Sequence, residues 1–318
     1  MHRVHAELTR LAVGGRVQLA HQPVEETRSG LPLAEGFTAT PDTLGGIDVL
    51  RLDGPPDGDS VILYFHGGGY VIGTPRTHAQ LASQVAALAD SNAISVDYRL
   101  APEHPYPAGL DDALAVYRAL LASGTAPATV AFAGDSAGGG LAVAALLAAR
   151  DAGLPLPAAA VLFSPWTDLT LSGASYTSKA DAELILTVAG LREWAADYAG
   201  GTAPGDHLIS PLFADLTGLP PLLIQVGSDE ILLDDSTGLA SRAAAADVAV
   251  SLHVTPGAPH VFQRFAGSLD EADIALASAG AFIRAHLSGA PLVLLISCQA
   301  VNGRTRCPAG SISRADRR

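Results

Sequence analysis

The sequence predicts an α/β protein in which a mainly parallel sheet carries helices on both faces. Short apolar runs rich in β-forming residues alternate along the chain with longer segments whose apolar residues recur at helical spacing. Most of the short runs are apolar at successive positions, as expected for strands buried on both faces. Strand and helix in regular alternation indicate parallel pairing through crossover helices.

Each predicted strand or helix is identified by the spacing of its apolar residues, which changes between the two kinds of segment. Several helical segments also begin at Pro or Ser and end at Gly, which are ordinary helix boundaries. The predicted strands are SVILYFH (60–66), NAISVDY (92–98), TVAFAG (129–134), AAVLFS (159–164), LLIQVG (222–227) and VSLHVT (250–255), and the predicted helices cover 75–90, 109–123, 136–153, 235–248 and 268–287.

Two regions interrupt the alternation. Residues 1–45 hold a helix-like stretch followed by a segment rich in Pro, Gly and Glu, and residues 170–210 hold helical pieces and loops. We expect both regions to form a cap over one edge of the sheet. The domain that contains the sheet would span residues 46–288 and include the second part of the cap. Residues 289–318 differ in composition from the rest, with five arginines, one aspartate and both cysteines. We interpret this tail as a non-native extension without function; the alternative is an oligomerisation or anchoring tail.

Composition excludes some partners. A formal net charge of −13 argues against binding to nucleic acid or to an anionic membrane. The first residues lack the apolar core of a signal peptide, and the apolar run in the tail is far too short to span a bilayer. We therefore expect a soluble cytoplasmic protein. Cys298 and Cys307 stand in neither a CxxC nor a metal-ligand spacing, so the cysteines indicate no metal site, and two thiols do not make a disulfide framework.

A serine stands at a predicted turn from strand to helix. Gly134-Asp-Ser-Ala-Gly138 matches G-x-S-x-G, in which glycines let strand and helix approach closely and strain pushes the Ser136 hydroxyl into open space. A hydroxyl is a weak nucleophile and needs a base oriented by a third group. Asp229 and Glu230 follow one late strand, and His260 follows another. We assign Ser136 as nucleophile, His260 as base and then acid, and Asp229 as the orienting acid, with Glu230 as its rival.

A glycine run follows the first predicted strand. His66-Gly-Gly-Gly69 is suited to an oxyanion hole, because bare backbone can approach the developing charge of an acyl-transfer reaction. We assign the N–H groups of Gly68, Gly69 and Ala137 to this role, and expect His66 to fix the loop. Tyr70 and Trp166 are candidates for lining the substrate pocket or for packing.

Together these motifs resemble the bacterial hormone-sensitive-lipase-like esterases, lipolytic family IV of the α/β-hydrolase fold. The resemblance covers roughly residues 60–265. It rests on HGGG, YRLAPE (98–103) with Pro107-Ala108 and Asp111-Asp112, GDSAGG (134–139), SPW (164–166) with Asp168, Asp229, and His260 with Phe262.

The resemblance implies an eight-stranded, mostly parallel sheet with a helical cap. It also implies a serine carboxylesterase that hydrolyses short- to medium-chain carboxylic esters through an acyl-enzyme, without cofactor. Family members often dimerise through the last strand, here near 250–255, so a homodimer is one expected arrangement. Asp111 and Asp112 are interpreted as structural, and Glu103 as satisfying buried polar groups. Two alternatives stay open: a non-catalytic small-molecule receptor on the same scaffold, and an amidase or peptidase.

Overall fold

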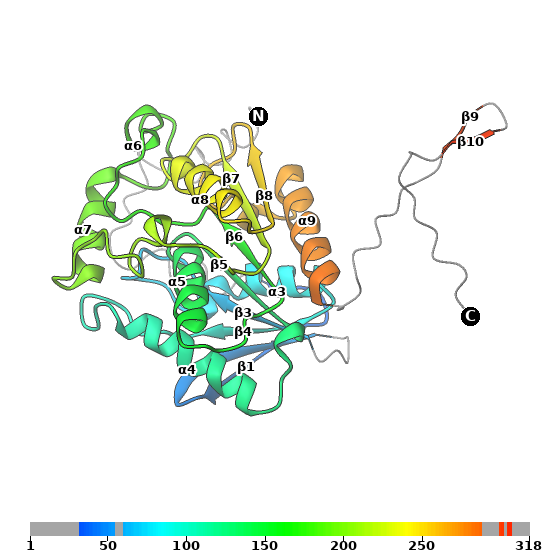
Figure 1. Cartoon of the computed structure of the whole chain (residues 1–318), viewed down its shortest axis with the longest axis horizontal. Helices are drawn as coiled ribbons and strands as arrows, with labels where there is room; N and C mark the ends of the chain where they lie inside the picture. The colour runs from blue at the N-terminus through cyan, green and yellow to red at the C-terminus, as the bar shows by residue number, and fades with distance from the viewer. Residues whose placement is uncertain (1–31, 55–59, 288–298, 302–303, 307–318) are drawn as a thin grey trace. The chain divides into compact units, whose positions relative to one another are not determined.

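The computed structural model describes residues 32–54, 60–287, 299–301 and 304–306. Its body is built on an eight-stranded sheet with strand order β1-β2-β4-β3-β5-β6-β7-β8 (Figure 1). The β1–β2 and β2–β4 pairs are antiparallel and every other pair is parallel. The predicted fold class is thereby confirmed. The strands are β1 (Thr38–Leu44), β2 (Ile47–Asp53), β3 (Val61–Phe65), β4 (Asn92–Val96), β5 (Val130–Asp135), β6 (Ala159–Phe163), β7 (Leu222–Gly227) and β8 (Val250–Thr255).

The sheet is apolar on both faces because successive strand residues point to opposite sides. In β3, Ile62 and Tyr64 belong to one core cluster, while Leu63 and Phe65 belong to the other. All five predicted helices are present: α3 (Ala79–Leu88), α4 (Ala108–Ala122), α5 (Ala137–Asp151), α8 (Leu233–Ala245) and α9 (Asp270–Leu287). Residues of α3 and α9 pack in the cluster that contains Ile62, and residues of α4, α5 and α8 pack in the cluster that contains Leu63.

One boundary of the predicted cap is wrong. Residues 38–44, which lie within the range 1–45 assigned to the cap, form the edge strand β1 and pair with β2. Residues 1–31 of that range lie outside the described residues. The interruption at 170–210 has the expected character: it consists of loops and two helices, α6 (Ser175–Ser178) and α7 (Val188–Ala199).

The tail forms a separate unit from Gly289 onward. Its described residues are two short strands, β9 (Gln299–Val301) and β10 (Arg304–Arg306), which pair in antiparallel fashion. Cys298 and Cys307 lie outside the described residues. The interpretation of this tail as a non-native extension stays a prediction.

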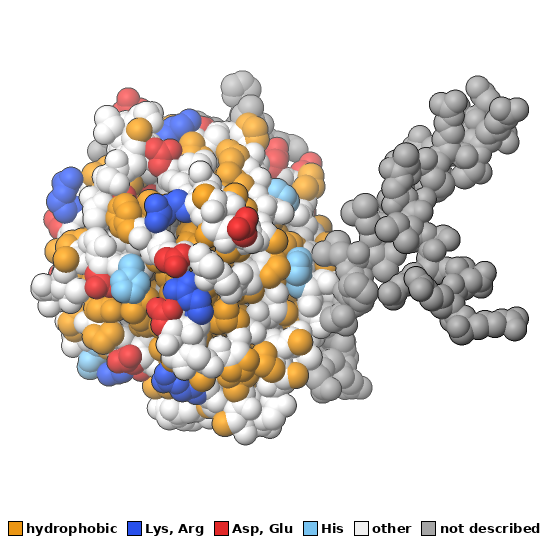
Figure 2. Space-filling model, in the orientation of Figure 1, with side chains coloured by type: hydrophobic (Ala, Val, Ile, Leu, Met, Phe, Trp, Pro, Cys, Tyr) orange, Lys and Arg blue, Asp and Glu red, His pale blue; other side chains and the backbone are white. Residues whose placement is uncertain are grey.

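The surface of the body mixes charge and apolar area. On the face drawn in Figure 2, acidic, basic and apolar side chains are interspersed. Among the helices that the structure describes, none combines the length and the apolar character needed to cross a membrane.

Candidate active site

Ser136 lies at a sharp turn between β5 and α5. Its backbone has φ 54° and ψ −122°, a conformation that costs energy in any residue with a side chain. Two bonds hold the turn: the Ser136 N–H donates to Phe163 O at 2.8 Å, and Ser136 O accepts from the Trp166 N–H at 2.9 Å. A Cβ at Gly138 would overlap the carbonyl oxygen of Phe65, so only glycine fits there. The sequence motif thus has the steric basis inferred for it.

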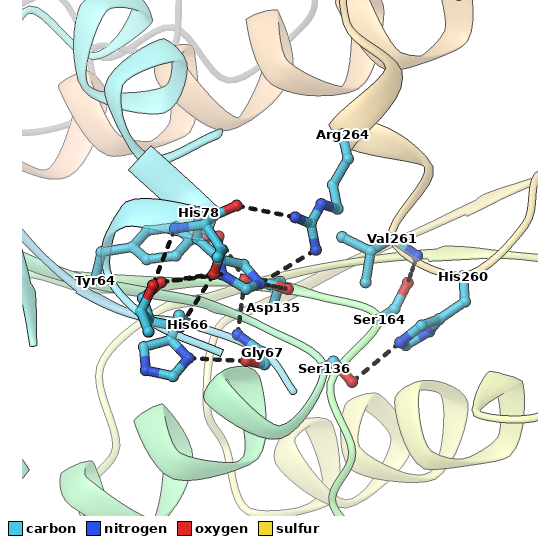
Figure 3. Close-up of polar contacts among 12 residues, drawn as sticks. Tyr64, His66, Gly67, His78, Asp135, Ser136, Ser164, His260, Val261 and Arg264 are labelled. Carbon is cyan, nitrogen blue, oxygen red and sulfur yellow. Dashed lines mark hydrogen bonds and ion pairs between the residues drawn. The ribbon is translucent and has the colours of Figure 1, made fainter. Parts of the chain in front are cut away.

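The hydroxyl of Ser136 meets the ring of His260. Ser136 Oγ lies 3.0 Å from His260 Nε2, and His260 follows β8, as expected (Figure 3). On the other side of the ring, Nδ1 lies 2.7 Å from Oε2 of Glu230. A carboxylate only accepts, so Nδ1 carries the proton and Nε2 is left to accept from the Ser136 hydroxyl.

The acid that contacts His260 is Glu230, so the assignment of this contact to Asp229 is wrong. Asp229 is partly exposed, and its carboxylate accepts from the Ser228 hydroxyl at 3.2 Å. Glu230 is fully buried, and its second oxygen accepts from the Ser164 hydroxyl at 2.8 Å and from the Gly227 N–H at 2.7 Å. Both carboxylate oxygens of Glu230 are therefore held, and its extra methylene gives the reach to the ring.

The surroundings of His260 favour its protonated form. Burial alone would lower the pKa of the ring, but the charge and hydrogen bond of Glu230 outweigh burial, with further contributions from Glu183 and Asp135. The pKa of His260 is therefore raised above 6.5. The ring therefore binds a proton more readily than a free imidazole does.

The glycine run lies beside Ser136. Gly68 has φ +123°, and a Cβ there would overlap the carbonyl of Ile72. No group among the described residues accepts a hydrogen bond from the N–H of Gly68, Gly69 or Ala137. His66 packs behind the run, where its Nδ1 lies 2.8 Å from Gly67 O and its ring stacks on Tyr98. Burial lowers the pKa of His66 to about 3, so the ring is neutral.

A cavity of about 80 Å³ opens at Ser136 and His260. Gly68 and Gly69 border it, in keeping with their predicted position. Its wall contains both apolar and polar side chains. The apolar ones are Ile72, Ile185, Leu186, Trp194 and Val261, and the polar ones include Thr77, His78, Asp135 and Arg264.

Tyr70 and Trp166, the two candidates for lining the pocket or for packing, do not line this cavity. Both are buried, and their ring centroids lie 5.8 Å apart. Tyr70 stacks on Tyr198 of α7 at 3.8 Å, and the Trp166 indole donates to Asp168 O. They pack the interior beneath the segment 170–210, which is the second of the two roles that the sequence left open.

The remaining acidic residues of the motifs, Asp111, Asp112 and Glu103, differ in how deeply they are buried. Asp112 is buried and pairs with Arg99, with contacts down to 2.7 Å, which supports its structural interpretation. Asp111 is exposed in the first turn of α4. Glu103 was expected to satisfy buried polar groups, but it is exposed, so that expectation is wrong.

Sequence reasoning missed Glu183, which ties the segment 170–210 to the loop that carries Glu230. Its Oε1 accepts from the N–H groups of Ile185 and Leu186, at 2.7 and 3.0 Å. Its Oε2 accepts from the N–H of Ile231 at 3.0 Å, next to Glu230. One side chain therefore fixes two cavity-lining residues relative to the histidine's partner. No motif marks Glu183, because its partners are backbone groups, one of them far away in the sequence.

Comparison with known proteins places this site in a family context. Residues 62–264 match a family model described as the alpha/beta hydrolase fold. An acetyl-hydrolase of Streptomyces hygroscopicus is 46% identical over 255 residues, covering 80% of this chain and 84% of the relative. An esterase of Acinetobacter venetianus is 39% identical over 246 residues, covering 76% and 80%.

A solved structure agrees with these relatives. The crystal structure of an esterase from the bacterial hormone-sensitive lipase family matches with a TM-score of 0.85 and 43% identity. The match covers 90% of this chain and 97% of that one. At this identity and coverage the likeness concerns the whole body and not the site alone.

Proposed function

This chain belongs to the α/β-hydrolase family, among the bacterial esterases related to hormone-sensitive lipase, and from that premise we propose that it is a serine carboxylesterase for short-chain esters. That it hydrolyses carboxylic esters follows from the family. We propose in addition that Ser136 is the nucleophile, that the reaction passes through an acyl-enzyme, and that the acyl groups are short. The observation that carries it is the chain of contacts from Ser136 Oγ to His260 Nε2 at 3.0 Å and from His260 Nδ1 to Glu230 at 2.7 Å.

The proposed reaction begins with attack by Ser136 Oγ on the ester carbonyl carbon, while His260 Nε2 takes the hydroxyl proton. The carbonyl oxygen becomes an oxyanion, held by the N–H groups of Gly68, Gly69 and Ala137. Collapse of this intermediate expels the alcohol, which takes its proton from His260. Water then attacks the acyl carbon while His260 takes a proton from it, and His260 returns this proton to Ser136 Oγ as the acyl bond breaks and the acid leaves. Glu230 stabilises the imidazolium in both halves without taking its proton.

The cavity supports a preference for small acyl groups. A volume of about 80 Å³ is a few times the space that one buried water needs. The apolar side chains of Ile185, Leu186 and Trp194 in its wall suit an alkyl chain. The acetyl-hydrolase among the relatives is in keeping with a short acyl group.

A series of p-nitrophenyl esters from acetate to palmitate tests the proposal. We expect kcat/KM to peak at acetate to hexanoate and to fall sharply beyond octanoate, and we expect Ser136→Ala to lose at least about 10⁴-fold in kcat on every ester. Higher activity on palmitate than on butyrate would contradict the short-chain claim. A folded Ser136→Ala variant with wild-type activity would contradict the nucleophile.

A further inference from the structure

The residue immediately before the nucleophile reaches back to the glycine loop. Asp135 is buried, and its Oδ1 accepts from the Tyr64 hydroxyl at 2.8 Å and from the Gly67 N–H at 3.1 Å (Figure 3). Asp135 is joined to Ser136 by one peptide bond, and Gly67 is joined in the same way to Gly68. The hydrogen bond between Asp135 and Gly67 therefore connects the segment of the nucleophile to the glycine loop, and the proposed reaction needs these two segments in a fixed relative position.

Basic side chains keep this buried carboxylate charged. Oδ2 of Asp135 lies 3.5 Å from His78 Nε2, which lies 3.2 Å from Nη1 of Arg264. Nη2 of Arg264 donates to Thr77 O at 3.1 Å, which fixes the guanidinium. Burial alone would raise the pKa of Asp135, but His78, Arg264 and Tyr64 reverse this and hold it well below its usual range. An ionised acceptor makes stronger hydrogen bonds than a neutral one.

Other contacts fix the loop carrying the glycines on either side, including the stacking of Tyr70 on Tyr198. Behind it, the Tyr98 hydroxyl donates to His66 O at 2.7 Å. Farther along, Gly68 O accepts from the N–H groups of Val71 and Ile72 at 3.1 and 3.0 Å, which closes a turn but ties it to nothing near Ser136. The Asp135–Gly67 hydrogen bond differs from these contacts, because it joins the start of the loop to the nucleophile's own segment.

We propose that Asp135 is a positioning residue that fixes the amides of Gly68 and Gly69 relative to Ser136 through its hydrogen bond with the Gly67 N–H. This inference rests on the proposed function, because it concerns donors to an oxyanion. An oxyanion donor is effective only within hydrogen-bond distance of the charge, and loss of one donor costs about 10²–10³-fold in kcat. Asp135, which also borders the cavity, therefore acts on the transition state through the amides of the glycine loop.

Steady-state kinetics on p-nitrophenyl butyrate test this role in Asp135→Ala and Asp135→Asn. We expect Asp135→Ala to lose about 100-fold in kcat, with KM within about threefold of wild type. Asparagine keeps an oxygen that can accept from Gly67, so Asp135→Asn should recover at least about tenfold of that loss. Asp112→Ala is the matched control: it removes another buried carboxylate, paired with Arg99, and should lose stability but keep kcat.

A trifluoromethyl ketone provides the second measurement. Its adduct with Ser136 carries an oxyanion at the same amides, so Asp135→Ala should weaken inhibition by about the same factor by which it lowers kcat. Should Asp135→Ala not fold, Asp135→Ser takes its place, because its hydroxyl is too short to reach the Gly67 N–H.

The outcomes distinguish the positioning role from the esterase proposal. Wild-type kcat and inhibitor affinity in a folded Asp135→Ala or Asp135→Ser variant would overturn the positioning role and leave the esterase proposal intact. The positioning role is also overturned if Asp135→Asn is as impaired as Asp135→Ala. An active Ser136→Ala variant would instead remove the proposed function on which the inference depends.

Discussion

Oε2 of Glu230 lies 2.7 Å from Nδ1 of His260, whereas the carboxylate of the preceding Asp229 contacts Ser228 and is partly exposed. Two neighbouring acids in one loop therefore have different environments. The buried one is held by Ser164 and Gly227 as well as by the ring. Ser164 also accepts from the Val261 N–H at 3.1 Å, so it links the acid to the loop of the histidine in addition to the direct contact.

Replacement of the two acids should have unequal effects. We expect Glu230→Ala to lower kcat by about 10⁴-fold, because the imidazolium loses its partner and the ring loses the bond that sets its tautomer. Asp229→Ala, the matched control, should stay within about threefold of wild type. Kinetics on p-nitrophenyl butyrate measure both. A larger loss in Asp229→Ala than in Glu230→Ala would make Asp229 the orienting acid after all.

The pH profile should report the raised pKa of His260. The ring must be neutral to act as a base, so kcat/KM should rise with pH through a midpoint above 6.5. Since the folded pKa is raised, protonated His260 stabilises the fold fully below the unfolded pKa, and this contribution is lost as pH rises through the folded value. Glu230→Gln should move the kinetic midpoint to lower pH. An unchanged midpoint in that variant would mean that Glu230 does not raise the pKa of His260.

The steric role of Gly138 can be tested with one methyl group. Gly138→Ala would push a Cβ into the carbonyl oxygen of Phe65, and we expect it to lower the free energy of unfolding by about 1–3 kcal/mol and to impair activity. Gly205→Ala is the control, because the added Cβ would meet only the Thr170 methyl at 3.7 Å. Thermal unfolding and ester hydrolysis measure the two effects. Equal stability in the two variants would mean that the turn can relax.

Glu183 should control the cavity wall more than the chemistry. In Glu183→Ala the backbone of Ile185 and Leu186 loses its acceptor, and we expect KM for p-nitrophenyl butyrate to rise about three- to tenfold. The preference against longer acyl chains should weaken at the same time. Glu193→Ala serves as control, since it removes an exposed glutamate of α7. Identical chain-length profiles in all three proteins would contradict this role.

The sequence predicted six of the eight strands of the sheet, because most of these six are apolar at successive positions. All six predicted strands and all five predicted helices occur, with small shifts at their ends. Two strands of the sheet were missed, β1 and β2. In β2, IDVLRLD, charged residues interrupt the apolar ones. The edge strand β1, TATPDTL, is polar, mostly exposed and contains Pro41. Proline and polar residues are tolerated at a sheet edge, where one side of the strand needs no partner. Such a strand lacks the apolar run that revealed the others.

The candidate site was predictable where a motif carries its own steric logic. Ser136, His260 and the glycine run lie where the strand ends would bring them. The choice between Asp229 and Glu230 depends on side-chain direction within a loop, which neither period nor composition encodes. The cavity wall depends on Ile185, Leu186 and Trp194, which come from a segment without a motif and meet the site only through tertiary packing.

Covalent labelling by diethyl p-nitrophenyl phosphate, followed by mass spectrometry of the intact protein and its peptides, tests the nucleophile itself. Ser136 should be that nucleophile, so we predict one phosphoryl adduct per chain, located on Ser136, formed in proportion to loss of esterase activity and absent from Ser136→Ala. Full inactivation with the adduct on another residue, or full labelling of Ser136 with activity retained, would contradict the proposed mechanism.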